Sequence, residues 1–409
     1  MDLISQTDAL AALCAQLRTQ EFVALDTEFM REATYWPKLC LVQAAAGPIE
    51  ALIDPLAPGL DLTPLFDLLQ DDAVTKVMHA ARQDIEIFWN LSGKAPYPLF
   101  DTQVAAMAAG YGDSIAYDAL VQSLLRRRVD KSSRFTDWSR RPLSDAQLAY
   151  ALADVTHLRD LYPKLHGQLE RRGRLHWLVD EMALLVDPQN YDTDPENAWM
   201  RLRTRKTNAD YLAALRAAAA WRERIAQAKD IPRARVLKDD ALLEIAEQRP
   251  TSPAALNALR AVPKGFGGSR QGEDLADAIH AALQNAADYA PTVEQSAPLP
   301  PSLGPVVELL KVLLKGESER IGVAARLIAT TSDLEAIALD DDAPVAALSG
   351  WRREVFGQRA LDLKHGKLAL SIRNRRVVAT AIAVETTEPA RCDEVEADLA
   401  IDPELTAST

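Results

Sequence analysis

Two carboxylates stand at the end of a stretch that is otherwise suited to a buried strand. The segment Phe22-Val-Ala-Leu-Asp26-Thr27-Glu28-Phe29 is apolar until it reaches Asp26 and Glu28. In a strand, residues two apart point to the same face, so these two side chains converge. Burying them without a partner is costly, and the usual partners are a cation or a bound metal. Taken alone, the pair also fits a polar strand end that enters a turn.

Three more residues downstream carry acidic or hydroxyl groups. Asp84 lies early in a predicted helix over 82–90, and Tyr150 and Asp154 lie four residues apart in a second predicted helix. Residues at this spacing share one face of a helix. Each feature also has a plainer interpretation. An acid near a helix N-terminus compensates the helix dipole, and Tyr-x-x-x-Asp is a common pair.

Together, the four carboxylates have the chemistry of a two-metal site. Two Mg²⁺ or Mn²⁺ ions about 4 Å apart need hard oxygen ligands, and one carboxylate can bridge them. Such a pair activates a water and stabilises the leaving oxygen of a phosphodiester. The sequence therefore predicts metal ligands at Asp26, Glu28, Asp84 and Asp154, with Tyr150 as a fifth catalytic residue.

In order and spacing, these motifs resemble the DEDD family of 3′→5′ exonucleases, in the branch with tyrosine in the last motif. Asp26-Thr27-Glu28 matches the first motif of that family, Asp84 the second, and Tyr150-Ala-Leu-Ala-Asp154 the third. The segment Asp137-Trp138-Ser-x-Arg141-Pro142-Leu143 precedes the third motif, as it does in the family. Each motif alone is weak, and the specificity lies in their combination.

The resemblance implies a role for each of the five residues. Asp26 bridges both metals, and Glu28 and Asp154 complete the site of the attacking water. Asp84 supports the second metal through water. Tyr150 orients the attacking water, because a phenol can hydrogen-bond it without acting as a metal ligand.

Substrate contacts are predicted close to these motifs. The candidates are Thr27, Phe29, His79 and Trp138. Phe29 directly follows Glu28, where a ring can stack on a terminal base. For these residues, packing or structural support is the alternative role.

The elements around the motifs predict a mixed α/β sheet, since a strand meander is followed by strands that alternate with helices. Strands are expected at about 22–29, 39–44, 51–54 and 75–79, and helices at 5–18, from 63, at 82–90 and from 144 to 171. Ser144-x-x-Gln147 is a capping box for the last helix, and Asp101 is predicted to be an N-cap. The resemblance implies an N-terminal α/β exonuclease domain of the ribonuclease H-like type over 1–187.

The rest of the chain predicts helices. After a polar linker at 188–206, the segment 207–287 resembles the HRDC-type helical domain that is shared with RecQ-type helicases. A linker at 288–302 contains four prolines and leads to 303–383, which resembles a second, degenerate HRDC-like domain. Both domains are expected to be all-α. The segment 384–409 is predicted to be an acidic, disordered tail.

The net charge of −13 conceals two segments of opposite sign. The stretch 385–409 holds eight acidic residues and one basic residue, whereas 201–238 holds eleven basic and three acidic residues. The basic segment predicts contact with RNA phosphates. The predicted contacts include Arg222, Arg224, Arg233 and Arg235. The alternative is a solvated basic helix face without a ligand.

Cysteine usage and hydropathy bound the compartment. The three cysteines lie far apart, which argues against a disulfide framework or a zinc site and favours a reducing cytoplasm. No apolar run approaches the ~18 residues of a membrane span, and the N-terminus lacks the features of a signal peptide.

The resemblance implies a metal-dependent 3′→5′ exoribonuclease that releases nucleoside 5′-monophosphates and trims tRNA precursors with a free 3′ end. Two alternatives stay open: an exonuclease that prefers single-stranded DNA, and a catalytically silent RNA-binding protein. DNA polymerase motifs are absent, and none of the acidic ligands is missing. No membrane and no obligatory protein partner is expected.

Overall fold

The computed structural model describes residues 3–204, 206–293 and 299–382 of the 409-residue chain. Two compact units form. The first comprises Met1–Pro300 with Ser318–Thr330, and the second comprises Pro301–Glu317 with Thr331–Thr409. The predicted disordered tail at 384–409 lies outside the described residues. Among the described residues, none of the helices combines the length and the hydropathy that a membrane-spanning helix needs.

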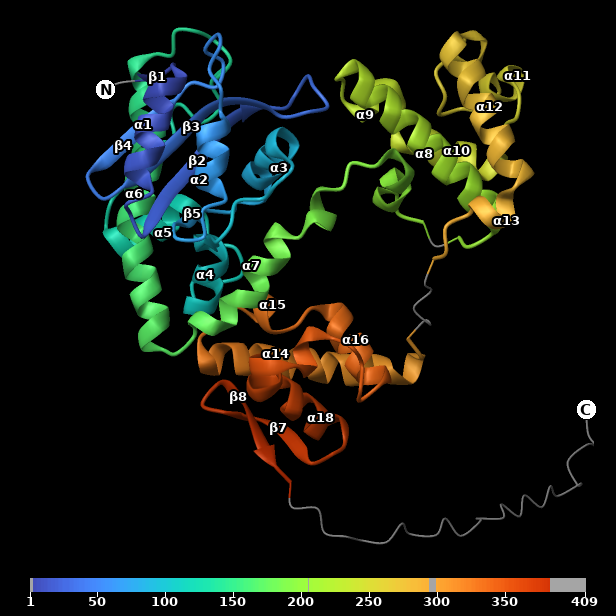
Figure 1. The fold of residues 1–409 in the computed structure, drawn as a ribbon. Helices are drawn as coiled ribbons and strands as arrows, with labels where there is room; N and C mark the ends of the chain where they lie inside the picture. The colour runs from blue at the N-terminus through green and yellow to red at the C-terminus, as the bar shows by residue number, and fades with distance from the viewer. Residues whose placement is uncertain (1–2, 205, 294–298, 383–409) are drawn as a thin grey trace, which may run out of the picture. The chain divides into compact units, whose positions relative to one another are not determined.

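A six-stranded mixed sheet forms the centre of the N-terminal part (Figure 1). Its strands are β1 (Leu3–Ile4), β2 (Phe22–Met30), β3 (Lys38–Ala46), β4 (Ile49–Ile53), β5 (Thr75–Met78) and β6 (Leu99–Asp101). The order across the sheet is β1-β4-β3-β2-β5-β6. β2, β3 and β4 form the predicted antiparallel meander, and β5 and β6 continue the sheet in parallel from β2. The prediction of a mixed α/β sheet is confirmed.

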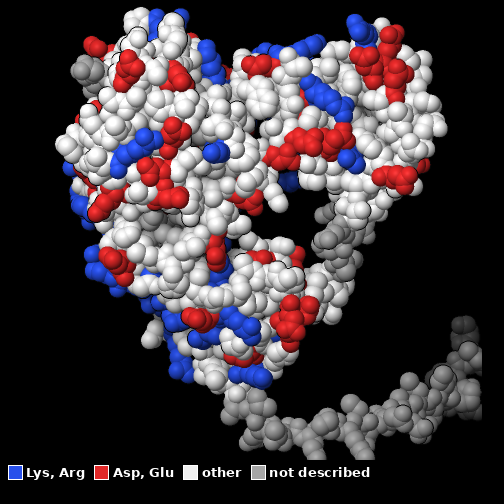
Figure 2. Space-filling model, in the orientation of Figure 1, with Lys and Arg blue, Asp and Glu red and all other residues white. Residues whose placement is uncertain are grey.

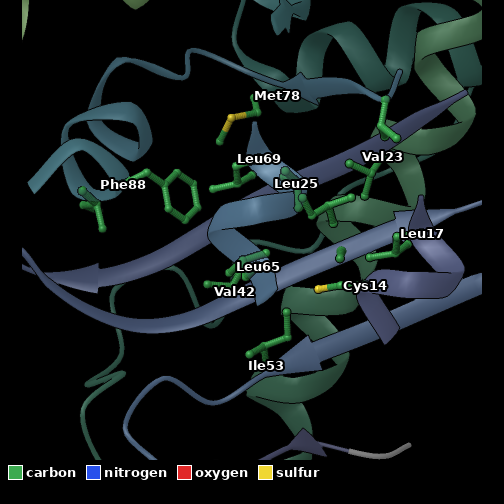
Figure 3. Packing of buried hydrophobic residues seen from close by; sticks show 14 of the residues in the cluster. Cys14, Leu17, Val23, Leu25, Val42, Ile53, Leu65, Leu69, Met78 and Phe88 are labelled. Carbon is green, nitrogen blue, oxygen red and sulfur yellow. The ribbon is translucent and has the colours of Figure 1, made fainter. Parts of the chain in front are cut away.

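Seven helices accompany this sheet in the described residues. They are α1 (Thr7–Leu17), α2 (Thr63–Leu69), α3 (Arg82–Ser92), α4 (Thr102–Ala109), α5 (Tyr117–Leu125), α6 (Asp145–Arg171) and α7 (Leu178–Val186). Neighbouring strand residues point to opposite faces, and this alternation divides the core into two layers. Val42 packs in the layer of α1, α2 and α3, whereas Leu41 packs in the layer that α6 contributes to. Figure 3 shows the first layer, in which residues of β2 and β3 meet Leu17 and Leu65.

The predicted capping box begins α6. The Ser144 hydroxyl accepts a hydrogen bond from the Gln147 backbone, and the Gln147 side chain bonds back to the Ser144 backbone. Just before this cap, the Arg141 guanidinium donates hydrogen bonds to both carboxylate oxygens of Asp54, at 2.8 and 2.6 Å. It also donates to the carbonyl of Cys40 in β3. The loop before α6 is thereby fixed to the end of β4.

The first helical region lies in the same unit. Its helices are α8 (Ala209–Lys229), α9 (Arg233–Val236), α10 (Asp239–Gln248), α11 (Pro253–Asn257), α12 (Arg270–Gln284) and α13 (Ala286–Tyr289). They surround a separate apolar core that includes Leu215, Leu242 and Ile279. The all-α prediction for this segment agrees with the structure.

The later helical region combines helices with a hairpin. Its helices are α14 (Gly304–Ile321), α15 (Ala325–Ile328), α16 (Thr331–Leu339), α17 (Gly350–Arg352) and α18 (Gln358–Lys364). An antiparallel pair, β7 (Leu368–Arg373) and β8 (Arg376–Ala381), follows. The sequence does not predict this hairpin, so the segment predicted as all-α contains two strands.

The Arg141–Asp54 pair generates a stability prediction. The Asp54 side chain is 8% exposed and that of Arg141 is 25% exposed. Arg141→Ala therefore leaves a nearly buried carboxylate without its cationic partner. We expect this variant to lose about 2–3 kcal/mol in free energy of unfolding, somewhat less than for a fully buried pair. Urea unfolding followed by circular dichroism measures the loss. Arg140→Ala is the control, because its side chain is 84% exposed. Equal stability of the two variants would contradict the bracing role.

Candidate active site

The four predicted carboxylates line a single cavity of about 580 Å³. Asp26 and Glu28 come from β2, Asp84 from α3, and Asp154 from α6. Asp84 and Asp154 are buried, and Asp26 and Glu28 are partly exposed. Tyr150 lines the same cavity. The five residues that sequence spacing groups together are therefore neighbours in space.

The end of β2 is shaped around its two acids. Asp26 and Glu28 share a face of the strand, and the pairing of β2 with β3 shifts register directly after Glu28. Such irregularities re-aim side chains and are common next to active sites. The strand end is also fixed to α3, because Arg31 donates two hydrogen bonds to Glu86, at 2.8 and 2.6 Å. This pair holds the end of β2 beside the helix that carries Asp84.

Asp84 is placed by the chain turn that precedes α3. Asp101, the predicted N-cap of α4, accepts from the backbone of Gln103 at 2.7 Å. Its carboxylate also accepts from the backbone N–H groups of Ala80 at 3.1 Å and Ala81 at 2.8 Å. Ala80 has a positive φ of 54°, a conformation that costs energy for a residue other than glycine. One carboxylate thus fixes both the start of α4 and the strained entry to α3.

Hydroxyl groups that line the cavity form hydrogen bonds to the acidic residues. The Thr27 hydroxyl donates to Asp84, and the Tyr117 hydroxyl donates to the backbone carbonyl of Asp154. Tyr150, one helical turn from Asp154, lowers the pKa of that carboxyl group. The ring of Tyr150 lies 6.0 Å from that of Trp138. The Thr27 bond restricts the rotamer of Asp84, and the Tyr117 bond holds the backbone of α6 at Asp154.

Burial raises the pKa of all four carboxyl groups, and repulsion by neighbouring acids raises it further for Asp26, Glu28 and Asp84. Burial is the largest cause in each case, and the charge of Asp26 adds to it for Glu28 and Asp84. The pKa reaches about 8 for Asp26 and about 9 for Glu28. It reaches about 7 for Asp154 and rises well above the usual range for Asp84. Arg134 acts in the opposite direction by lowering the pKa of Glu28 and Asp154.

The donor set fits hard divalent cations. Several converging carboxylates with little neutralising charge are the ligands that Mg²⁺ and Mn²⁺ take in proteins. Within the described residues, however, no three acidic, histidine or cysteine side chains are already arranged to coordinate one ion. The fit therefore rests on the kind and number of oxygen donors and on their convergence in one cavity.

The predicted substrate contacts divide into two groups. Thr27, Phe29 and His79 line the cavity, although Thr27 is engaged with Asp84 and Phe29 packs against the core. His79 bonds to the Thr102 hydroxyl at 2.9 Å. The prediction for Trp138 is wrong, because its ring is 2% exposed and forms part of the core beneath α6. Its role is to support Tyr150.

Two of the four predicted arginine contacts are structural instead. The guanidinium of Arg222 is 4% exposed, and it donates to Asp239 at 2.6 Å and to the Leu237 carbonyl at 3.0 Å. That of Arg233 is paired with the buried Glu223. Neither side chain is free for a phosphate, so both predictions need correction.

The surroundings of Arg233 explain why it is held. Its guanidinium also donates to the Tyr35 hydroxyl at 2.9 Å, and that hydroxyl donates to Glu223. Asp230 accepts from the backbone of Tyr35 and of Trp36, each at 3.0 Å. Within this unit, the cluster joins the loop between β2 and β3 to the helices α8 and α9.

Arg224 and Arg235 remain on the surface. Arg224 is paired with Glu196, whereas Arg235 is exposed and makes no ion pair within the part of the chain that the structure describes. On the face shown in Figure 2, the region of α8 to α13 carries acidic and basic side chains next to one another. Much of the predicted positive charge is therefore neutralised locally.

The cavity also contains residues that the sequence does not predict. These are Gln83, Gln103, Tyr117, Lys131, Arg134 and Phe135. Lys131 pairs with Asp118 at 2.8 Å, and the Arg134 guanidinium lies 5.2 Å from the centre of the Phe135 ring. The sequence does contain a signal for Arg134 and Phe135, because a cation and an aromatic residue adjoin there in a polar loop directly before the Asp137 motif.

Comparisons with known proteins agree with this site. Residues 1–170 match the family model described as 3′-5′ exonuclease, and residues 212–279 match the HRDC domain. Ribonuclease D of Nitrobacter hamburgensis is 53% identical over 379 residues, which cover 92% of this chain and 99% of that protein. Ribonuclease D of Granulibacter bethesdensis is 50% identical over 376 residues, which cover 92% and 95%.

A solved structure extends the likeness to three dimensions. The crystal structure of Escherichia coli RNase D, described as an exoribonuclease involved in structured RNA processing, superposes with a TM-score of 0.76 at 31% identity. The match covers 89% of this chain and 98% of that chain. Fold and site together define a 3′–5′ exonuclease, a metal-dependent hydrolase, joined to an HRDC domain.

The chain belongs to the ribonuclease D family. Its class is therefore that of the 3′–5′ exoribonucleases, and the predictions of family, fold class and enzyme class are confirmed. The HRDC match ends at residue 279, so the second, degenerate copy over 303–383 stays a prediction.

The raised pKa values generate a prediction about stability without metal. A carboxyl group with a raised pKa holds its proton longer in the folded state, so stability falls as pH rises from the unfolded value near 4 toward the folded value. For Asp26, that interval ends at about pH 8. In EDTA, we expect the Tm of the protein to fall between pH 5 and pH 9. Asp26→Asn should raise Tm by about 2–4 °C at pH 8 and flatten the profile.

Differential scanning fluorimetry in EDTA measures both effects. Glu32→Gln is the matched control, because Glu32 is an exposed acid that does not line the cavity. Addition of Mg²⁺ or Mn²⁺ should stabilise the wild-type protein more than Asp26→Asn. A Tm for Asp26→Asn no higher than that of the control at pH 8 would show that the carboxylates do not repel one another.

Proposed function

We propose that Asp26, Glu28, Asp84 and Asp154 hold two Mg²⁺ or Mn²⁺ ions and that the enzyme removes nucleoside 5′-monophosphates from RNA 3′ ends. The observation that carries this proposal is the convergence of four carboxylates from β2, α3 and α6 on one cavity. When bound, such metals activate a water and stabilise the charge on the phosphodiester oxygens.

The chain's own groups divide the remaining work. Asp26, whose charge raises the pKa of both Glu28 and Asp84, would supply oxygen ligands to the metals. Glu28 and Asp154 would hold the metal that activates the attacking water, and Asp84 would help to hold the second metal. Thr27, through its bond to Asp84, fixes the rotamer of that acid.

Tyr150 positions the attacking water. Burial, followed by the nearby Asp154 charge, raises the pKa of its phenol above the usual range, so the hydroxyl keeps its proton at neutral pH. A protonated hydroxyl can donate one hydrogen bond and accept another without becoming a metal ligand. Its ring is supported by the buried Trp138. Tyr150 is therefore suited to orienting a water rather than to taking its proton.

We infer that tRNA precursors with a free 3′ end are among the substrates. The E. coli relative is described as acting in structured RNA processing, and the HRDC domain adds a second surface that can meet such an RNA. No obligatory protein partner enters this proposal. A cytoplasmic location stays a prediction from the cysteine pattern.

Substitution of a ligand tests the reaction. Asp154→Asn should lower turnover by at least two to three orders of magnitude, because it removes a charged oxygen donor from the metal position. Turnover on a 3′-extended tRNA precursor is measured in Mg²⁺ and in Mn²⁺, with EDTA as the blank. Glu32→Gln should cleave at the wild-type rate. Near-wild-type turnover by Asp154→Asn would sink the two-metal assignment.

The same assay tests the direction of degradation and the preference for RNA over DNA. A 3′-phosphate end should strongly inhibit degradation, and a circular RNA should survive. A DNA strand of the same sequence is the arm for the single-stranded DNA alternative, which faster cleavage of DNA than of RNA would favour. Binding without cleavage in every arm would favour the silent RNA-binding protein.

The surface arginines and lysines of the helical region make a separate prediction. Arg203, Arg235 and Lys238 are exposed and make no ion pair in the described parts of the chain. Their combined substitution by Ala should weaken binding of a tRNA precursor. It should also reduce the slope of log affinity against log salt by roughly 0.7 to 0.9 for each lost phosphate contact. Cleavage of a short unstructured RNA should change little.

Fluorescence anisotropy across a salt series in EDTA measures this slope. The control is a triple variant with the same charge change at Lys94, Arg140 and Lys315, which are exposed outside this region. If both triple variants shift affinity and slope equally, the helical surface has no specific role in holding RNA.

A further inference from the structure

The loop between α5 and α6 brings an unusual side chain to the mouth of the carboxylate cavity. Val129, Lys131, Arg134 and Phe135 of this loop line the cavity. Phe135 is 90% exposed, which is the largest exposed fraction among the large apolar side chains that the structure describes. A solvent-facing phenyl ring beside a polar site is the combination used for stacking on bases.

The other aromatic rings of the cavity are already engaged. Phe29 packs against the core, the Tyr117 hydroxyl bonds to the Asp154 backbone carbonyl, and the Tyr150 ring lies 6.0 Å from that of the buried Trp138. His79 lies 5.2 Å from the Tyr117 ring. Phe135 differs from all of these, since its ring faces solvent at the entrance.

The loop that carries Phe135 is held at several points. The Thr136 hydroxyl donates to the Ser133 carbonyl at 2.8 Å, and the Gln147 side chain donates to the Thr136 hydroxyl at 3.1 Å. Ser133 is buried, and Lys131 pairs with Asp118 at 2.8 Å. Because its neighbours are fixed, the ring can meet a ligand with little loss of conformational entropy.

Arg134 supplies a cation next to this ring. Its guanidinium lies 5.2 Å from the ring centre, and its side chain is exposed at the cavity. Its field reaches Glu28 and Asp154 inside the cavity. The acids of the cavity repel a phosphodiester, so a cation at the entrance offsets that repulsion where the strand has to enter. A ring for a base and a guanidinium for a phosphate together match one nucleotide.

We propose that Phe135 and Arg134 form a nucleotide-binding subsite for the RNA strand at the entrance of the active site. Phe135 stacks on one base within a few nucleotides of the 3′ end, and Arg134 binds a phosphate next to it. Stacking tolerates every base, so this subsite contributes affinity without sequence preference. The inference rests on the proposed nuclease site, because it places the strand relative to the carboxylates.

Abasic substrates test the stacking partner. A short RNA receives an abasic nucleotide at one of the four 3′-terminal positions in turn, and its dissociation constant is measured in EDTA by anisotropy. Phe135→Ala should weaken binding of the intact RNA by about 5- to 100-fold, and Phe135→Trp should restore it. At one position, the abasic substitution should weaken wild-type binding but add little to the loss in Phe135→Ala.

Two outcomes would overturn the stacking role. One is binding by Phe135→Ala that matches the control Leu91→Ala, which truncates an apolar side chain that is 51% exposed on α3 and outside the cavity. The other is full additivity of the Phe135 and abasic losses at all four positions. Thermal unfolding checks that the variants fold, and exposed positions such as these should shift stability little.

A salt series tests Arg134. Arg134→Ala should lower the slope of log affinity against log salt by about 0.7, the value for one phosphate contact with a single strand. Arg134→Lys should keep the slope, and Arg140→Ala, in the same loop but outside the cavity, should leave it unchanged. An unchanged slope in Arg134→Ala would overturn the phosphate contact. Binding in EDTA does not depend on turnover, so absence of metal-dependent cleavage by the wild type would sink the proposed nuclease mechanism separately.

Discussion

Repulsion among four carboxylates in one cavity is the constraint on which the rest of the exonuclease domain depends. Burial raises the pKa of each group and neighbouring acids add to it for Asp26, Glu28 and Asp84, so the folded protein holds these acids at a cost in stability. Such a cluster persists only where the surrounding structure fixes it more strongly than the repulsion disperses it. The fixing groups are themselves polar, which links the architecture of the domain to its chemistry.

Three anchors supply that fixing, and each acts on a different element. Asp101 binds the backbone at the entry to α3, Arg31 ties the end of β2 to Glu86 of α3, and Arg141 ties the loop before α6 to Asp54. None of the three anchoring side chains contributes an oxygen to the cavity. The four DEDD acids therefore belong to a larger set of charged residues. The other members of this set bind polar partners outside the cavity and thereby fix the elements that carry the acids.

The sequence predicts the acids well because their spacing follows local geometry. Asp26 and Glu28 share a strand face, Tyr150 and Asp154 share a helix face, and the capping box places the start of α6. Trp138 and Phe135 show where local patterns fail. Both are aromatic residues in one polar loop, yet one is 2% and the other 90% exposed. Which ring turns inward depends on the α6 layer of the core, and no short-range pattern encodes that packing.

The basic segment shows a related limit of local patterns, because a charge count ends at the borders of its window and does not reveal that Arg222 and Arg233 are held in ion pairs. The +8 over 201–238 omits three acids that lie outside this window, namely Asp239, Glu196 and Glu247. They pair with Arg222, Arg224 and Lys206, respectively. A salt bridge is set by distance in space, so a local sum over sequence overstates the free charge that a phosphate meets. The loop before α6, over 126–144, holds seven basic and two acidic residues, and among them Arg134 stands beside the acids and an exposed ring. For a polyanion approaching an acidic cavity, the place of a cation in space therefore matters as well as the number of cations along the sequence.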